Sequence, residues 1–236
     1  MENYLIDRLS VFFPAYNEEK NIKNTVEKAI KVLNKVAQVW EIIIVNDGSN
    51  DKTGEIADEL SQKDKRIRVI HHKPNRGYGA ALKSGFYNSK YPWIVFTDSD
   101  GQFDFSQLSD FIGKQKETGA DLVVGYYLKR AVPFYRKLNT FLWQAVVRVL
   151  FNLKVRDIDC GFKLISKSVI DSIPKLESER GAFISSEFLI KAQKSGFKIV
   201  EIGAKHYAAT RPGTGAKLNV IIKSFIDLFK LWKKLR

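Results

Sequence analysis

Sulfur-containing residues are scarce in this sequence. Its 236 residues include one methionine and one cysteine, Cys160, so no disulfide can form within the chain. This cysteine usage suits a reducing compartment such as the cytoplasm. The three histidines, His71, His72 and His206, do not cluster with cysteine at metal-binding spacing. The sequence therefore offers no zinc motif.

Long apolar runs are also absent. No run approaches the roughly 20 residues that a membrane-spanning helix needs. The first eight residues lack a basic flank followed by an apolar core, so they do not resemble a secretory signal. We therefore expect a protein that is soluble or rests on a membrane surface. With 44% hydrophobic and 28% charged residues, the composition is that of a folded chain.

Positive charge is in excess. Lysine and arginine number 39 and aspartate and glutamate 26, which gives a net charge of +13. This excess favours an anionic partner, such as nucleic acid, acidic lipid or a phosphorylated substrate. No aromatic-rich RNA-binding motif is present, which argues against nucleic acid. The P-loop pattern Gly-x-x-x-x-Gly-Lys-Ser/Thr is missing as well, which argues against an ATPase.

Apolar, β-branched runs alternate with helical patterns through the first half of the chain. This alternation predicts an α/β fold with a mostly parallel sheet flanked by helices. Ligands of such sheets bind beyond the carboxyl ends of the strands. The predicted strands cover residues 9–13, 41–46, 66–71, 93–97 and 121–125, and the predicted helices cover residues 21–39, 53–63, 78–89 and 106–118.

The second half of the chain ends in a basic amphipathic helix. Apolar residues with Trp and Phe form one stripe on residues 217–235, and lysines surround it. Such a helix suits a surface of anionic lipid, although the stripe could instead pack on this domain or on a second copy. We expect one domain over residues 1–216 and this helix over residues 217–236. Before it, helices are expected at 134–153 and 183–195, a short segment at 160–165 and a strand at 198–202.

Two carboxylates, Asp98 and Asp100, directly follow the fourth predicted strand, and Gln102 adds a neutral oxygen. This spacing can direct oxygen ligands at one hard divalent cation, Mg²⁺ or Mn²⁺, that also binds substrate phosphates. Such a cation would offset charge on a leaving diphosphate. An Asp-x-Asp pair alone is a weak signal, because a solvated turn before a helix has the same composition.

Polar turns follow other strands at the same predicted edge. Glu18, Asp47 and Asp98 would converge there, where mutual repulsion is costly without a cation or donor groups. The segment Asn75-Arg-Gly-Tyr-Gly begins the third helix, and its glycines let the backbone approach a ligand. A helix N-terminus also favours phosphate. The convergence predicts a site for a phosphorylated ligand at this edge.

Four motifs together resemble a known family. Pro14-Ala-Tyr-Asn-Glu18, Asn46-Asp-Gly-Ser-Asn-Asp51, Asn75-Arg-Gly-x-Gly and Asp98-Ser-Asp-Gly-Gln102 have the order and spacing of family-two glycosyltransferases of the GT-A (Rossmann-like) fold. The branch that they resemble contains the dolichyl-phosphate mannosyltransferases and other polyprenyl-phosphate glycosyltransferases. The resemblance covers residues 9–125. It implies a metal site at Asp98, Asp100 and Gln102, and a nucleotide pocket formed by Pro14, Ala15, Tyr16, Glu18, Asp47, Ser49, Arg76, Gly77, Lys83, Asp98 and Ser99.

The second half also resembles this branch. The segment Asp157-Ile-Asp159-Cys-Gly-Phe is similar to one that closes the sugar pocket, which implies catalytic roles for Asp157, Asp159 and Asp100. Residues 211–217 are similar to a loop that binds phosphates, with Thr214 and an inserted-looking Gly215-Ala216 in place of the usual Ser-Lys ending. An arginine common in the branch after the fifth strand is replaced by Tyr127. The predicted cradle for an acceptor phosphate is therefore Arg130, Arg136, Arg211 and Lys217.

The resemblance implies an inverting transferase that moves a hexose from a GDP- or UDP-linked sugar to a polyprenyl phosphate. It would lie on the cytoplasmic face of a membrane, with or without a membrane-embedded partner subunit. A saccharide or glycolipid hydroxyl is the alternative acceptor, and it would need a general base, for which Glu187 is the candidate. A non-catalytic scaffold that binds a nucleotide sugar is a further alternative. A nucleotidyltransferase is disfavoured, because its Gly-rich first loop is missing.

Overall fold

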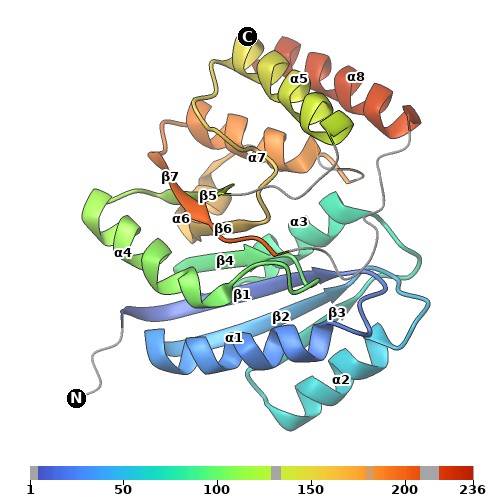
Figure 1. Cartoon of the computed structure of the whole chain (residues 1–236), viewed down its shortest axis with the longest axis vertical. Helices are drawn as coiled ribbons and strands as arrows, with labels where there is room; N and C mark the ends of the chain where they lie inside the picture. Colours follow the sequence, from blue (N-terminus) through green and yellow to red (C-terminus); the bar gives the residue numbers. More distant parts are fainter. Residues whose placement is uncertain (1–4, 129–133, 180, 182, 208–217, 236) are drawn as a thin grey trace.

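The computed structural model describes residues 5–128, 134–179, 181, 183–207 and 218–235, without the side chains of residues 134–139 and 218–223. In these residues one seven-stranded sheet lies between two layers of helices (Figure 1). The strand order is β3-β2-β1-β4-β6-β5-β7. The strands are β1 (Ile6–Ala15), β2 (Ala37–Asn46), β3 (Ile67–His71), β4 (Trp93–Thr97), β5 (Leu122–Tyr127), β6 (Phe162–Ser166) and β7 (Ile199–Ala204).

The predicted, mostly parallel sheet is confirmed. Strands β3, β2, β1 and β4 are parallel neighbours, and β5 and β7 are parallel as well. Only β6 among the described strands runs against its neighbours, β4 and β5. The carboxyl ends of all the parallel strands therefore meet at one edge of the sheet, where β6 begins.

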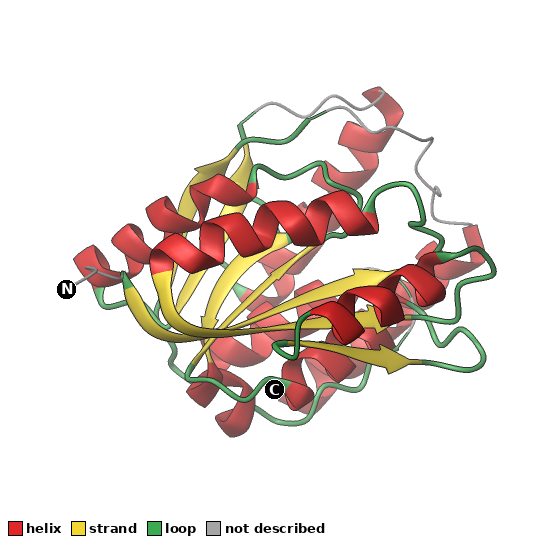
Figure 2. Cartoon of the chain, turned by 90° about the horizontal axis from the view of Figure 1, so that it is seen from below, coloured by secondary structure: helices red, strands yellow, loops and turns green. Residues whose placement is uncertain are grey.

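Each face of the sheet is covered by its own helices (Figures 1 and 2). Successive residues of β1 alternate between two apolar clusters, with Val11 and Phe13 in one and Phe12 in the other, because a strand points its side chains to opposite faces. The first face carries α1 (Ile22–Val36), α2 (Thr53–Lys63) and η1 with α4 (Phe105–Gln107, Leu108–Thr118). The second carries α3 (Tyr78–Asn88), α5 (Phe134–Phe151), α6 (Lys167–Ser172), α7 (Phe183–Lys194) and α8 (Leu218–Leu235).

Most element bounds agree with the predicted ones, and the differences have physical causes. The first helix ends at Val36 rather than at residue 39, and Ala37 already pairs with Ile6 as part of β2. No glycine or proline separates the two elements, so the sequence carries no stop signal. The short segment expected at 160–165 is the antiparallel strand β6, and the short helix α6 was not expected.

Aromatic rings fix the close packing of α3 on the sheet. The ring of Phe12 lies 5.0 Å from that of Phe86 and 5.5 Å from that of Phe96. Gly85 makes this approach possible, because a Cβ at that position would overlap the Phe12 ring. The contact holds the start of α3 near the ends of β1 and β4, and thus near the acidic turns.

Helix α8 packs on the domain through one side. Leu228 is fully buried, Leu231 is nearly so, and the ring of Phe225 lies edge-on to Trp143 of α5 at 5.1 Å. The packing alternative for its apolar stripe is therefore confirmed for this side. Ile226 and Phe229 remain about half exposed, at 50% and 49%. The division of the chain after residue 216 stays a prediction.

We predict that Leu228→Ala lowers the free energy of unfolding by about 2–5 kcal/mol, because it leaves a cavity under α8. Urea denaturation of the purified chain measures this loss. Ile226→Ala on the exposed side is the matched control and should change the free energy by less than about 0.5 kcal/mol. Equal effects of the two variants would mean that α8 does not pack in this way.

Candidate active site

Acidic residues gather where β1 and β4 end. Asp98 follows β4 directly, Asp100 lies two residues later, and Glu18 stands in the turn after β1. Asp98 Oδ1 accepts a hydrogen bond of 3.0 Å from the Tyr78 hydroxyl at the start of α3. Asp100 Oδ1 accepts one of 3.0 Å from the backbone N–H of Gln102. The predicted convergence of carboxylates is confirmed for Glu18 and Asp98.

These groups shift one another's protonation. Burial, followed by the negative charge of Asp100, raises the pKa of Asp98 to about 7, while the Tyr78 hydrogen bond and Lys163 oppose the rise. The charge of Glu18 adds to the rise. Burial and the Asp98 charge raise the pKa of Tyr78 well above its usual value, so its hydroxyl keeps its proton and donates to Asp98. The site carries more negative charge than its neighbours neutralise.

A divalent cation fits this residue set. Two aspartates two residues apart offer hard oxygen ligands, and a cation would remove the repulsion that raises the Asp98 pKa. Within the described residues no group of three or more His, Cys, Asp or Glu side chains is arranged as a complete metal site. Further ligands would therefore come from substrate phosphates and water. Gln102, the third predicted ligand, uses its side-chain N–H to bind the Tyr207 carbonyl at 2.9 Å.

Asp47, a predicted nucleotide ligand, is held by protein donors. Its two carboxylate oxygens bond to the His72 ring at 2.6 Å, the Asn75 amide at 2.9 Å, and the N–H groups of Arg76 and Gly77 at 3.0 and 2.8 Å. Gly77 has φ +101°, a conformation that favours glycine. Asp47 thus shapes the turn before α3, and its contact with the nucleotide stays a prediction.

The other predicted nucleotide residues divide into buried and exposed ones. Ser99 is buried, and its hydroxyl donates to the Pro14 carbonyl at 2.7 Å, which ties the end of β4 to the end of β1. The Ser49 hydroxyl accepts the Asn17 N–H at 3.0 Å, which links the first two turns. Ala15 is buried, whereas Tyr16 is exposed at the same edge. The contact of Tyr16 with the nucleotide stays a prediction.

Arg76 and Lys83 converge on one carboxylate. Both donate to Glu179 Oε1, at 3.1 and 3.0 Å. Their charges, together with the Lys83 hydrogen bond as the largest effect, lower the pKa of Glu179. The two cations predicted to bind the nucleotide therefore lie side by side, with Arg76 half exposed and Lys83 largely buried. Their role toward the nucleotide stays a prediction.

The segment before β6, residues 157–161, lies next to the acidic turn that follows β4. Asp157 is buried, and its Oδ1 accepts the N–H of Asp159 at 3.0 Å. Gly161 touches Asp98, since a Cβ at Gly161 would overlap the Asp98 carboxylate. Burial raises the pKa of the neighbouring Cys160 thiol to about 12, so it stays protonated. The catalytic roles predicted for Asp157 and Asp159 stay predictions, but their segment does reach Asp98.

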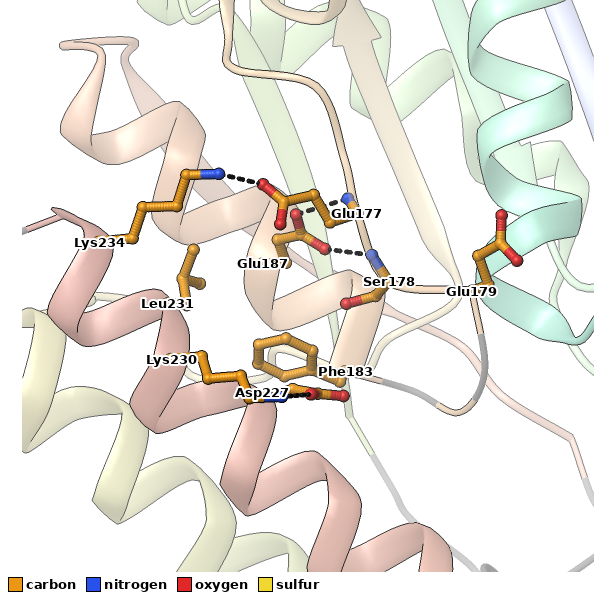
Figure 3. Close-up of a pocket in the computed structure, with 9 residues that line it drawn as sticks. All are labelled: Glu177, Ser178, Glu179, Phe183, Glu187, Asp227, Lys230, Leu231 and Lys234. Atoms are coloured by element: carbon orange, nitrogen blue, oxygen red, sulfur yellow. Dashed lines mark hydrogen bonds and ion pairs between the residues drawn. The ribbon is translucent and has the colours of Figure 1, made fainter.

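Glu187, the candidate general base, lies elsewhere. It lines a cavity of about 490 Å³ between α7, α8 and the segment before α7 (Figure 3). Its carboxylate accepts the N–H groups of Glu177 and Ser178 at 2.8 and 2.9 Å and pairs with Lys191 at 2.6 Å. The cavity includes no residue of the 98–102 turn. Glu187 fixes the segment that carries Glu179, and its role as a base stays untested.

The structure also brings forward residues that the motifs did not single out. Tyr78 donates to Asp98, and the ring of His206 lies 4.7 Å from Tyr127 and 5.0 Å from Phe103 at the same edge. Tyr78 lies within the glycine-rich segment Asn75-Arg-Gly-Tyr-Gly, so its place in that motif could have indicated a role at the site.

Of the predicted acceptor cations, Arg130, Arg211 and Lys217 lie outside the described residues. Arg136 belongs to α5, but its side chain is not described.

The raised Asp98 pKa predicts an unusual pH dependence of stability. The folded state binds the Asp98 proton more tightly than the unfolded chain does, and this tighter binding stabilises the fold. The stabilisation is fully present below about pH 4 and is lost as the pH rises through about 7. With EDTA present, Asp98→Asn should therefore gain thermal stability over the wild type as the pH rises from about 5 to about 8. Melting curves at several pH values measure the difference.

Asp104→Asn provides a control. The Ser106 hydroxyl lowers the pKa of Asp104, so the ionised carboxylate stabilises the fold above about pH 4. The stability difference between that variant and the wild type should therefore stay constant between about pH 5 and pH 8. A constant difference for Asp98→Asn across the range would contradict the raised pKa.

Comparison with known proteins agrees with this arrangement. The family model for glycosyl transferase family 2 matches residues 10–173. Glycosyltransferase AglD of Haloferax volcanii is 31% identical over 199 residues, covering 82% of this chain and 32% of that protein. Dolichyl-phosphate beta-glucosyltransferase of Dictyostelium discoideum is 33% identical, covering 82% and 64%. The human protein of that name is 30% identical, covering 83% and 66%. The chain spans between a third and two thirds of these relatives.

The fold has solved counterparts. Glucosyl-3-phosphoglycerate synthase from Mycobacterium tuberculosis, in complex with Mn²⁺, UDP and phosphoglyceric acid, matches with a TM-score of 0.71. The match covers 97% of this chain and 78% of that chain at 18% identity, which shows a shared fold. The expected GT-A architecture is thereby confirmed. Because the family model spans the strands and turns that build the acidic edge, this chain belongs to glycosyl transferase family 2.

Proposed function

We propose that the chain is an inverting, metal-dependent glycosyltransferase that transfers a hexose from a UDP- or GDP-linked sugar to a polyprenyl phosphate. The observation that carries the proposal is the acidic pair Asp98 and Asp100 at the carboxyl ends of the strands, in a family whose similar members include dolichyl-phosphate glucosyltransferases. Bound there, Mg²⁺ or Mn²⁺ would offset the charge of the leaving diphosphate.

The acceptor explains why a general base is dispensable. A lipid phosphate is already an anion near neutral pH. One of its oxygens would attack the anomeric carbon as the bond from that carbon to the diphosphate breaks, which inverts the configuration. No proton needs to be removed. The residues around the acceptor phosphate need positive charge instead, for which Arg130, Arg136, Arg211 and Lys217 are the candidates.

A hydroxyl acceptor would require a different arrangement. It needs a carboxylate to take its proton, and the predicted one, Glu187, already accepts three hydrogen bonds from protein groups. Its carboxylate oxygens are therefore already engaged by protein groups, and it lines the cavity beside α8, which includes no residue of the 98–102 turn. This contrast favours the phosphate acceptor over a saccharide or glycolipid hydroxyl.

A lipid acceptor also calls for contact with a membrane, and we place the chain on its cytoplasmic face. Helices α5 and α8 form the outermost layer (Figure 1) and leave large apolar side chains exposed. Val149 of α5 is 84% exposed, and Phe141, Leu142, Ile226 and Phe229 are about half exposed or more. Lys230, Lys233 and Lys234 are exposed on α8. Apolar groups next to lysines suit anionic lipid.

No described helix has both the length and the apolarity needed to cross a bilayer. Membrane contact in the described residues would therefore be peripheral, through the layer of α5 and α8. A membrane-embedded partner could supplement it.

We predict that the wild type, with Mn²⁺ and radiolabelled UDP- or GDP-hexoses, moves label into an organic-soluble polyprenyl product. Asp100→Asn should lower this rate by about 100-fold or more, because the charge on the leaving diphosphate is no longer offset. Asp104→Asn, which changes a nearby and partly exposed aspartate, is the matched control and should retain activity. NMR of the early product should show an inverted anomeric configuration.

Other outcomes would redirect or reject the proposal. Metal-dependent hydrolysis of the donor without a lipid product would move the acceptor to a hydroxyl. Donor binding without turnover would leave the non-catalytic scaffold as the function, and the absence of both would contradict the proposal. Retention of configuration would contradict the single displacement.

We predict that the wild type sediments with vesicles containing phosphatidylglycerol and that the double variant Val149→Asp/Phe229→Asp binds about tenfold or more weakly, since it loses apolar burial. Val39→Asp also puts a charge on an exposed apolar side chain, but in β2, and should bind as the wild type does. Equal binding of all three proteins would show that this layer does not contact the membrane.

A further inference from the structure

Strand β6 carries a fully buried lysine. Lys163 is 0% exposed, and its ammonium donates to the backbone carbonyls of Ile158, at 3.3 Å, and of Cys160. It also lies 5.0 Å from the centre of the Phe96 ring. Its neighbours in the strand are apolar and fully buried as well: Phe162, Leu164 and Ile165. A buried ammonium is costly unless it is bonded or paired, so this position calls for an explanation.

Its neighbours differ from those of Lys191, which is also fully buried. Lys191 forms a direct ion pair of 2.6 Å with the Glu187 carboxylate. Lys163 instead bonds two neutral carbonyls, while the carboxylate charges that act on it belong to Asp157, Asp159 and Asp98. Burial is the main cause that lowers its pKa, and those negative charges oppose it. Lys163 thus lies beneath the acidic edge, and within the described part of the chain it forms no ion pair.

Strand register connects Lys163 to Asp98. In the antiparallel pair, Lys163 stands opposite Phe96, and Phe162 stands opposite Thr97. The next residues on the two strands are Gly161 and Asp98, and a Cβ at Gly161 would overlap the Asp98 carboxylate. The turn whose carbonyls Lys163 binds therefore leads directly into the backbone that limits where the Asp98 side chain can lie.

We propose that Lys163 is a positioning residue for the transfer reaction, which fixes the turn of residues 158–160 and thereby sets Gly161 against the Asp98 carboxylate. The assignment rests on the proposed metal-dependent function, because Asp98 is a candidate metal ligand. Lys163 acts from below the site and touches neither donor nor acceptor. It also supplies positive charge to an edge with several aspartates. Groups that orient a metal ligand in this way tune metal affinity without contacting the metal.

The experiment compares UDP binding with and without Mn²⁺ by calorimetry, with GDP in parallel. In the wild type, Mn²⁺ should strengthen binding of the nucleotide. In Lys163→Met, which keeps the volume of the side chain but not the charge, this strengthening should fall by about 10- to 100-fold. Binding without Mn²⁺ should stay within about twofold of the wild type, because the turns after β1 and β2 are untouched.

A second variant tests the same contact without removing the lysine. Gly161→Ala places a methyl group against Asp98 and should lose the Mn²⁺-dependent gain in the same way, even if Lys163→Met fails to fold. Gly113→Ala is the matched control, because no atom lies within 4 Å of the added Cβ. It should bind UDP and Mn²⁺ as the wild type does. Circular dichroism confirms that each variant is folded.

The outcomes separate this inference from the proposed function. Folded Gly161→Ala or Lys163→Met with the full Mn²⁺-dependent gain would overturn the positioning role while leaving the metal site in place. A wild type whose nucleotide binding ignores Mn²⁺ would contradict the proposed metal-dependent function itself. Loss of binding in both the presence and the absence of Mn²⁺ in Gly161→Ala, with an intact fold, would also overturn the inference, because it would mean a general collapse of the pocket.

Discussion

Charge balance at the carboxyl end of β4 is the constraint on which the rest of the site depends. Asp98, Asp100 and Glu18 converge there, and burial together with Asp100 raises the Asp98 pKa to about 7. Tyr78 donates a hydrogen bond, and Lys163 supplies charge from below. These groups limit the repulsion without removing it. A site with this residual negative charge is suited to binding a cation together with an anionic ligand.

The reversed strand β6 makes this arrangement possible. A purely parallel sheet would bring only carboxyl ends to the edge, each followed by its own turn. Because β6 runs the other way, it begins at that edge, and the segment that leads into it crosses Asp98. The sheet thus places Gly161 and Lys163 where no neighbouring parallel strand could place them. The antiparallel pair contributes directly to the geometry of the site.

The sequence predicted the fold more completely than the roles of individual side chains. Alternating apolar runs located the parallel strands, and the turn motifs located the edge where Asp98 and Glu18 meet. The predicted end of the first helix was wrong, because no glycine or proline separates α1 from β2 in the sequence. Local patterns also could not show that Asp47 would be occupied by four protein donors. Nor could they show that Lys163, a residue type usually exposed, would be buried. Both depend on segments distant in the sequence.

The topology connects the candidate site to the outer helical layer. Strands β5 and β7 are parallel to β4 in this sheet, so they end at the same edge as Asp98. Along the chain, β5 leads to α5 and β7 leads to α8. These two helices carry the exposed Val149 and Phe229. A lipid phosphate at that edge could keep its hydrocarbon chain on the side of the molecule where α5 and α8 would meet a membrane.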